Sequence, residues 1–408
     1  MKPQQQRYED KDKGVITTVG DKTEPILHLD LTIEILIRLP AKSVFRFRCV
    51  SKHWCAIIRS RSFTDLFMSI SLRRPRLSLG YCIFHHGNNK PLFYFSSPLH
   101  HPQVPKNPPS MVSETLPLTY MGLFNSVRGI ILISLDRRHF VICNPTTRQV
   151  IRLPDGSNTS NICYMFLGYN PSNDQYKILR KIRSREDQSV QEHSVCTLET
   201  GQESLFSSWR HVESNILHCV RGCTAVCING VVYYGAGTKS SKRFVVMSFN
   251  VGSERLRHIQ GPNEEEYCTL INYRGKLACF SVNIYHNSFS LCVLDDVKEQ
   301  VWSTKTIVPS TSFYDLYWSL KLYISGTTDA GEIIFVSALI ADAVEIFYYD
   351  LKKNDVRRRV LGVGDIRDYD EFMCSPDHGE FFCPESLSRY IYRRISISCD
   401  HVENIIIF

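Results

Sequence analysis

The chain has 408 residues, a formal net charge of +7 and a hydrophobic content of 43%. That length allows two or three folded domains, each large enough to bury a core. The most apolar window, residues 333–341, is about half the ~20 residues that a membrane-spanning helix needs, so we expect no membrane partner. No secretory signal pattern opens the sequence. We therefore expect a protein of the cytoplasm or nucleus whose 15 cysteines stay reduced.

The positive charge is concentrated in one segment. Residues 38–76 contain ten Lys or Arg and a single acidic residue, Asp65, so this segment carries +9 and the rest of the chain carries −2. A charge confined in this way suits docking onto an acidic protein at least as well as binding to phosphates. We expect no nucleic-acid partner.

The first 70 residues divide into a tail and a helical domain. Residues 1–24 have almost no apolar side chains, and we predict a disordered tail. Residues 25–70 predict three short amphipathic helices, because apolar residues recur on one helix face after the N-cap Asp30 and again around the N-cap Ser51. The segment from residue 59 to residue 75 is interpreted as the link to the next domain. Three helices of this size have too little core to stand alone.

This helical segment resembles an F-box. The family pattern consists of an acidic-leucine pair, Glu-Ile-Leu, Arg-Leu-Pro, Lys-Ser, Arg-Phe-Arg-Cys-Val-Ser-Lys and a tryptophan. The matching residues, in the same order, are Asp30-Leu31, Glu34-Ile35-Leu36, Arg38-Leu39-Pro40, Lys42-Ser43, Arg46-Phe47-Arg48-Cys49-Val50-Ser51-Lys52 and Trp54. One residue departs from the pattern, since His28 stands where the family usually has proline.

The resemblance implies docking onto the SKP-type adaptor of a cullin-RING ubiquitin ligase. A purely structural interpretation, in which the same side chains form the core of a small helical bundle, stays open for some of them. The residues expected to bind the adaptor are Leu27, Leu31, Ile35, Leu36, Leu39, Pro40, Val44, Phe47, Val50 and Trp54.

The rest of the chain, residues 77–395, predicts an all-β domain. Turn signals such as Asn229-Gly230 and Arg274-Gly275 recur 45 to 56 residues apart and alternate with a second set that includes Asn144-Pro145 and Asp350-Leu351. A period near 50 residues with four short strands is the spacing of β-propeller blades, as in kelch-like repeats. Helical periodicity is not expected here, and residues 96–119, with six prolines, are interpreted as a loop.

Four strings in this region resemble the F-box-associated domain of plant F-box proteins. They are Phe140–Arg148 with Leu153-Pro154, Leu167–Leu179, Cys227–Tyr234 and Ser248–Val251. The resemblance implies a domain that recruits a target protein, without indicating which residues bind it.

No catalytic site, cofactor site or metal site is predicted. His218 with Cys219, Cys223 and Cys227 could suggest a metal, but structural zinc sites use close Cys-x-x-Cys pairs. Adjacent histidines at residues 85–86 and 100–101 point to opposite sides of an extended chain. The glycines at 362 and 364 lack the following helix of a phosphate loop.

The fold predicted from these patterns is a small three-helix F-box followed by a β-propeller-like domain. The predicted function is that of a non-catalytic substrate receptor, which joins a target protein to the adaptor and through it to the cullin. The alternatives are a glycan-binding F-box receptor, an adaptor-bound scaffold without a ubiquitylation target, and an enzyme built on a propeller.

Overall fold

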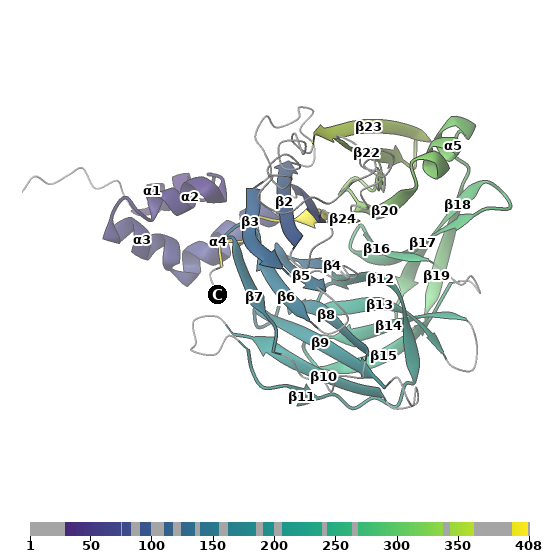
Figure 1. Cartoon of the computed structure of the whole chain (residues 1–408), viewed down its shortest axis with the longest axis horizontal. Coiled ribbons are helices and arrows are strands. Elements are labelled where there is room, and N and C mark those ends of the chain that lie inside the picture. The colour runs from purple at the N-terminus through teal and green to yellow at the C-terminus, as the bar shows by residue number, and fades with distance from the viewer. Residues whose placement is uncertain are drawn as a thin grey trace, which may run out of the picture.

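The structure of the protein is a computed structural model (Figure 1). It describes residues 29–74, 76–82, 90–98, 110–116, 124–134, 139–154, 162–184, 191–199, 206–238, 243–262, 268–337, 343–362 and 394–406. The predicted tail 1–24, His28, the histidines at 85–86 and 100–101 and Gly364 lie outside these residues. Within the described part, no helix is long and apolar enough to cross a membrane.

A helical module, residues 29–72, occupies one end of the molecule. Two serines cap its later helices, since Ser51 Oγ accepts from Trp54 N (3.2 Å) and Ser60 Oγ accepts from Phe63 N (3.3 Å). The helices are α1 (Leu29–Leu36), α2 (Ala41–Phe47), α3 (Lys52–Arg59) and α4 (Arg61–Leu72).

Helix α4 corrects the prediction of a link over residues 59–75. Phe63 and Phe67, one helical turn apart, are buried in the same core as Leu36 and Val44. This fourth helix supplies much of the apolar surface that three short helices lacked, because it covers their inner side.

A β-propeller follows the helices. Among the described residues, 24 strands form six four-stranded sheets, each of antiparallel strands. Five blades use consecutive strands: β4 (Phe124–Val127), β5 (Ile130–Ser134), β6 (Phe140–Asn144), β7 (Gln149–Arg152); β8 (Ile162–Asn170), β9 (Gln175–Arg183), β10 (Gln191–Leu198), β11 (Arg210–His211); β12 (His218–Ile228), β13 (Val231–Thr238), β14 (Phe244–Asn250), β15 (Arg255–Gln260); β16 (Thr269–Tyr273), β17 (Lys276–Asn283), β18 (Ser288–Asp296), β19 (Val301–Ile307); and β20 (Leu322–Thr327), β21 (Ile333–Ser337), β22 (Ala343–Asp350), β23 (Asp355–Gly362).

The remaining sheet closes the ring with both ends of the domain. Strand β24 (Arg394–His401) pairs with β1 (Arg76–Cys82), which continues through β2 (Lys90–Pro98) to β3 (Ser110–Leu116). The first strands of the blades and β24 contact one another in sequence around the centre. The propeller-like prediction is therefore confirmed, and the closing sheet joins residues more than 300 positions apart.

The predicted turns connect the strands as expected. Between first and second strands, the two-residue turns Arg128-Gly129, Asn229-Gly230 and Arg274-Gly275 have positive φ at both positions, which matches the twist of a hairpin. Between third and fourth strands, an Asn or Asp side chain accepts hydrogen bonds from backbone N–H groups two or three residues further on. The residues of this second kind are Asn144, Asn250, Asp296 and Asp350.

Two elements differ from the sequence-based prediction. Strand β3 lies inside residues 96–119, where a loop was expected, because its seven residues contain no proline and form the outer edge of their sheet. Helix α5 (Thr311–Ser319) begins after Ser310, whose Oγ accepts from Phe313 N (3.3 Å). The prediction that helical periodicity is absent after residue 77 is wrong here, because Phe313 and Tyr317 lie one helical turn apart and pack on Phe289 of β18.

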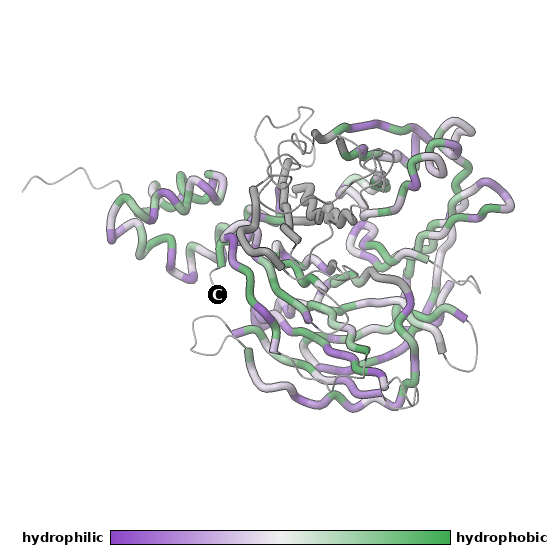
Figure 2. Tube along the Cα trace, viewed as in Figure 1, coloured by the Kyte–Doolittle hydropathy of each residue, from purple (hydrophilic) through white to green (hydrophobic). Residues whose placement is uncertain are grey.

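Hydrophobic residues recur along the strands of the blades and along the helices (Figure 2). Every residue of β6 is buried, as are the first six residues of β14, because each sheet packs against a neighbour on both faces. The large aromatic residues fill the space between the fourth and fifth consecutive blades, where Phe280, Phe289 and Phe335 contact one another.

The C-terminal tail, residues 402–406, joins the propeller to the helical module (Figure 1). Asn404 is fully buried, and its Nδ2 donates to Arg128 O (2.8 Å) and Tyr176 Oη (3.1 Å) in the first two blades. One residue earlier, Glu403 Oε2 accepts from Ala41 N (3.0 Å) at the start of α2. Ile405 is buried in the helical core. Five consecutive residues therefore contact both parts of the molecule.

Substitution of Gly129 tests how closely this tail packs against the β4–β5 turn. Its φ of +81° is unfavourable for other residues, and a Cβ would overlap Val402 O and lie 2.9 Å from Asn404 Cβ. Gly275 has the same turn and a φ of +80°, but nothing lies within 4 Å of its Cβ position. We expect Gly275→Ala to lower the free energy of unfolding by about 1–2 kcal/mol through strain alone. Gly129→Ala should lower the free energy of unfolding by about 1–3 kcal/mol more than Gly275→Ala does, because the added Cβ also overlaps the tail. Urea unfolding measures both values. Equal losses of stability in the two variants would show that the tail does not pack closely against this turn.

Candidate functional site

Large hydrophobic side chains of the helical module are exposed to solvent both on α4, where Leu66 and Leu72 are 41% and 43% exposed, and around α1 and α2. Leu29, Leu31 and Ile35 of α1 are 48%, 52% and 49% exposed, and Val50 after α2 is 63% exposed. We call these four residues the docking face. Several exposed apolar side chains on one small helical module are typical of a protein-binding site, because their burial against a partner would release further free energy.

The structure separates the predicted adaptor-binding residues into three groups. Leu36 and Val44 are fully buried and pack the helices together, so contact with an adaptor through them stays a prediction. Leu39, Phe47 and Trp54 are half-buried, and Leu31, Ile35, Pro40 and Val50 are exposed. The rings of Phe47 and Trp54 stack with centroids 5.0 Å apart. Leu27 lies outside the described residues.

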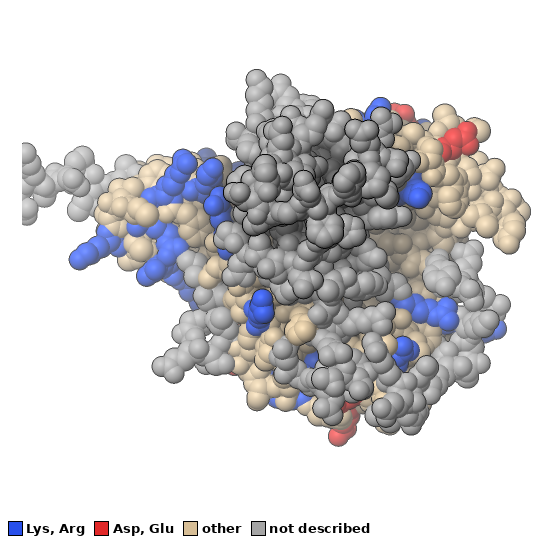
Figure 3. Space-filling view, in the orientation of Figure 1, with Lys and Arg blue, Asp and Glu red and all other residues tan. Residues whose placement is uncertain are grey.

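Basic side chains border the docking face. Figure 3 shows Lys and Arg gathered on the helical module, at the left of the view. Arg38 pairs with Glu34 at 2.5 Å along the exposed side of α1, whereas Lys42, Arg46 and Lys52 are exposed in a segment without acidic residues. The positive charge predicted from the sequence therefore lies on the same module as the docking face, as expected for binding to an acidic protein.

A second exposed apolar set lies on the far face of the propeller. The connections from second to third strands, and from one blade to the next, lie at this face, opposite the turns that contact the tail and α4. Tyr285 in the β17–β18 turn is 88% exposed, Trp318 of α5 is 50% exposed, and Leu217 before β12 is 46% exposed. These side chains are therefore available to a partner on the side away from the helices.

The histidine and cysteine cluster is held by hydrogen bonds. His218 Nδ1 lies 2.9 Å from Ile216 O, so this nitrogen carries the proton, and Nε2 accepts from Tyr234 Oη at 3.0 Å. Both ring nitrogens are thus occupied. Cys219 Sγ accepts from Arg183 Nη1 at 3.1 Å. In the part of the chain that is described, no three potential metal ligands lie together, and the side chain of Cys223 is not in that part.

Sequence reasoning missed a buried polar cluster beside this histidine. Lys181 Nζ is fully buried and donates to Gln191 Oε1 (2.5 Å) and to His218 O (2.9 Å). Burial lowers the pKa of Lys181 to about 7 and that of His218 to about 4. Burial, with Lys181 and His218 nearby, also lowers the pKa of His193 to about 3. Both histidines are therefore neutral at physiological pH.

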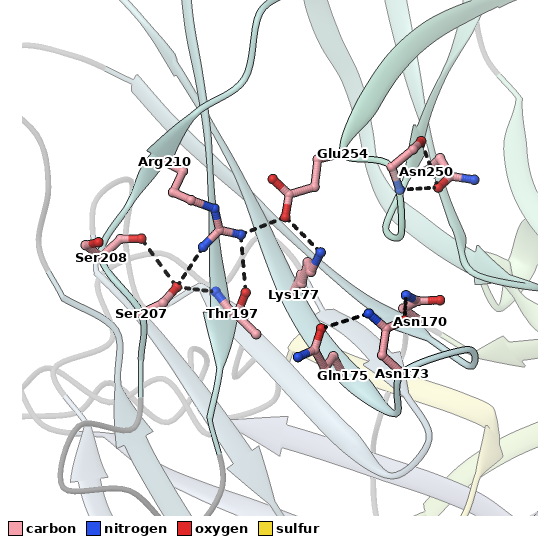
Figure 4. A network of polar contacts seen from close by, with 11 residues as sticks. Asn170, Asn173, Gln175, Lys177, Thr197, Ser207, Ser208, Arg210, Asn250 and Glu254 are labelled. Carbon is pink, nitrogen blue, oxygen red and sulfur yellow. Dashed lines mark hydrogen bonds and ion pairs between the residues drawn. The ribbon is translucent and has the colours of Figure 1, made fainter.

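An ion-pair network joins the second and third blades on the side of the helices (Figure 4). Glu254, in the β14–β15 turn, accepts from Lys177 Nζ (2.8 Å) and Arg210 Nη2 (2.6 Å), and the same arginine contacts Thr197 and Ser207. Burial alone would raise the pKa of Glu254, but the hydrogen bonds and charges of Lys177 and Arg210 lower it. One carboxylate therefore links β9, β11 and β14–β15.

The lowered pKa makes the contribution of Glu254 dependent on pH. Because the folded state holds the charged form, its stabilisation is present above the unfolded pKa and disappears as pH falls through the folded pKa. We expect Glu254→Gln to lower the free energy of unfolding by about 1–2 kcal/mol at pH 7. The difference should shrink at acidic pH. Asp295→Asn, which removes the exposed pair with Lys276, is the matched control and should leave the urea midpoint unchanged. A pH-independent loss in Glu254→Gln would contradict the assignment.

Comparisons with known proteins match both parts of the chain. The family model of the F-box domain matches residues 25–66, and that of the F-box associated beta propeller domain matches residues 81–379. The chain is 37% identical to F-box protein At1g30790 of Arabidopsis thaliana over 372 residues, which cover 84% of this chain and 92% of that protein. It is 35% identical to F-box protein At5g65850 of the same plant over 353 residues, covering 82% and 85%.

Proposed function

Because the chain belongs to the F-box proteins with an F-box-associated β-propeller domain, we propose that it is a substrate-recognition subunit of an SCF-type ubiquitin ligase. The helical module binds an adaptor of the SKP type, and through it the cullin. The propeller holds a target protein. The observation that carries the proposal is the docking face, which neither the propeller nor the tail covers although it belongs to the F-box.

The energetics of the docking face suit an interface. Full burial of a Leu or Ile side chain contributes about 1.5–3 kcal/mol, so the half-exposed Leu31 and Ile35 retain roughly half of that for a partner. The basic border adds attraction to an acidic adaptor and speeds association. The chain itself contributes position and orientation, while the transfer of ubiquitin takes place on other subunits.

Substitution of Ile35 tests adaptor binding. Ile35 is 49% exposed, so Ile35→Asp should leave the fold intact while placing a charge in the interface. We expect co-purification with a SKP-type adaptor to fall about 100-fold or more, which corresponds to roughly 3 kcal/mol. Leu217→Asp, at 46% exposure on the far face, is the control and should bind normally. Normal binding by Ile35→Asp would refute docking through α1. Leu36 is unsuitable for this test, because it is fully buried.

The same variant serves as a trap for the target. A receptor that binds its target but not the ligase should accumulate it, so proximity labelling with Ile35→Asp should enrich proteins that wild type depletes. We place the target on the far face. Adding Trp318→Ala should remove these proteins, whereas Val301→Ala should not, because Val301 is a 51% exposed residue at the start of β19, on the side of the helices. Identical protein sets for wild type and Ile35→Asp would favour a scaffold without a ubiquitylation target.

One alternative has an observation in its favour. Tyr285 and Trp318 expose aromatic rings on the far face, and such rings can stack on sugars. A glycan-binding F-box receptor would use these two residues. Glycan-array binding that is lost in Trp318→Ala would support this alternative, and an empty array would leave the protein target as the occupant of the far face.

A further inference from the structure

A cleft of about 670 Å³ lies between the helical module and the propeller. Residues of α2, α3 and α4 form one side, the β4–β5 and β8–β9 turns form the other, and the C-terminal tail lies at its edge. Met68, Tyr176 and Ile405 give it apolar walls. Its volume falls within the range of small-molecule sites, roughly 300–1,000 Å³. No part of the docking face lines it.

Four arginines line this cleft, which we call the arginine cleft: Arg48, Arg59, Arg61 and Arg128. Arg61 lies near Asp65 (3.8 Å) and Asp174 (3.4 Å), so its charge is compensated. The guanidinium groups of the other three form no ion pair within the described part of the chain. Asp65, Asp174 and Glu199 also line the cleft, so the four arginines leave it with a net charge of +1. The three guanidinium groups without an ion pair nevertheless offer hydrogen-bond donors and positive charge to an anion.

Arg128 is held in place before any ligand binds. Its backbone occupies the hairpin turn with a φ of +48°, and its guanidinium lies 4.1 Å from the centre of the Tyr169 ring. Tyr169 is itself fixed, because its hydroxyl donates to Asp174 Oδ1 at 2.6 Å. The Nε of Arg128 is buried and has no hydrogen-bond partner among the described residues. A guanidinium group ordered in this way loses little entropy when its terminal N–H groups bind an oxyanion.

We infer that the arginine cleft binds a small molecule that carries phosphate groups. Guanidinium groups bind phosphate oxygens through pairs of parallel hydrogen bonds, and several arginines together suit a multiply charged anion. Asn173 and Gln175 line the same cleft and offer amide groups to the uncharged part of such a ligand. Because the lining comes from both modules, the ligand would connect the helices to the propeller and stabilise their arrangement by mass action.

Binding of inorganic pyrophosphate to the full chain tests this inference, by calorimetry and by the thermal midpoint. We expect saturable binding and a raised midpoint for wild type. Arg59→Gln with Arg128→Gln should weaken binding about tenfold or more. Arg48→Gln with Arg59→Gln, two changes confined to the helices, should do the same if the first pair folds poorly. Arg255→Gln with Arg257→Gln removes the same charge from exposed positions on β15 and should bind as wild type does.

Three outcomes would overturn the inference. They are the absence of pyrophosphate binding at millimolar concentration, equal weakening in the β15 control pair, and tighter binding of citrate than of pyrophosphate, which would point to carboxylates. The result is independent of the proposed function, because the arginine variants keep the docking face. Their normal co-purification with the adaptor would show that a loss of pyrophosphate binding does not come from loss of the fold.

Discussion

The C-terminal tail is the connection on which the arrangement of the two modules depends. Asn404 occupies a fully buried position with partners in the first two blades, so each of its hydrogen bonds would be costly to leave unmade. Ile405, the next residue, belongs to the core of the helices. The strand immediately before the tail, β24, closes the propeller ring by pairing with β1. The same short stretch of chain therefore closes the propeller ring with β24 and holds the helices with the residues that follow it.

This arrangement has consequences for folding and for function. The contacts of the tail join residues from 228 to 362 positions apart, and such long-range contacts form late, because a long loop must be closed first. The finished molecule presents the docking face at one end and the far face of the propeller at the other. On the proposed function, a fixed geometry between these two surfaces holds a target at a constant position relative to the ligase.

Local patterns in the sequence predicted those parts of the fold that depend on local chemistry. Turns such as Asn229-Gly230 require positive φ, and their repetition gave the propeller period before any contact was known. Helix α4 has equally good signals in Ser60, Phe63 and Phe67, but the basic residues around it favoured the interpretation as a link. Strand β3 was hidden by prolines on both sides of it.

The site was predictable only in part. Helical periodicity placed Ile35 and Leu36 on one apolar stripe, yet the structure buries Leu36 completely and leaves Ile35 half exposed. The apolar stripe of a helix can be wider than the surface that packs against the core, so that some of its side chains are buried and others are exposed. Residue spacing alone does not tell which side chains are which. The arginine cleft had no signature beyond net charge, since Arg59 and Arg128 come together only when the tail docks the helices.

Hydrogen exchange in a chain that ends at His401 measures the role of the tail most directly. Without residues 402–408, the amides of α2 and α4 and those of the β4–β5 turn should lose protection together, because their shared partner is gone. Strands β17 and β18, which do not contact the tail, should keep theirs. Unchanged protection of α2 and α4 in the shortened chain would contradict the account.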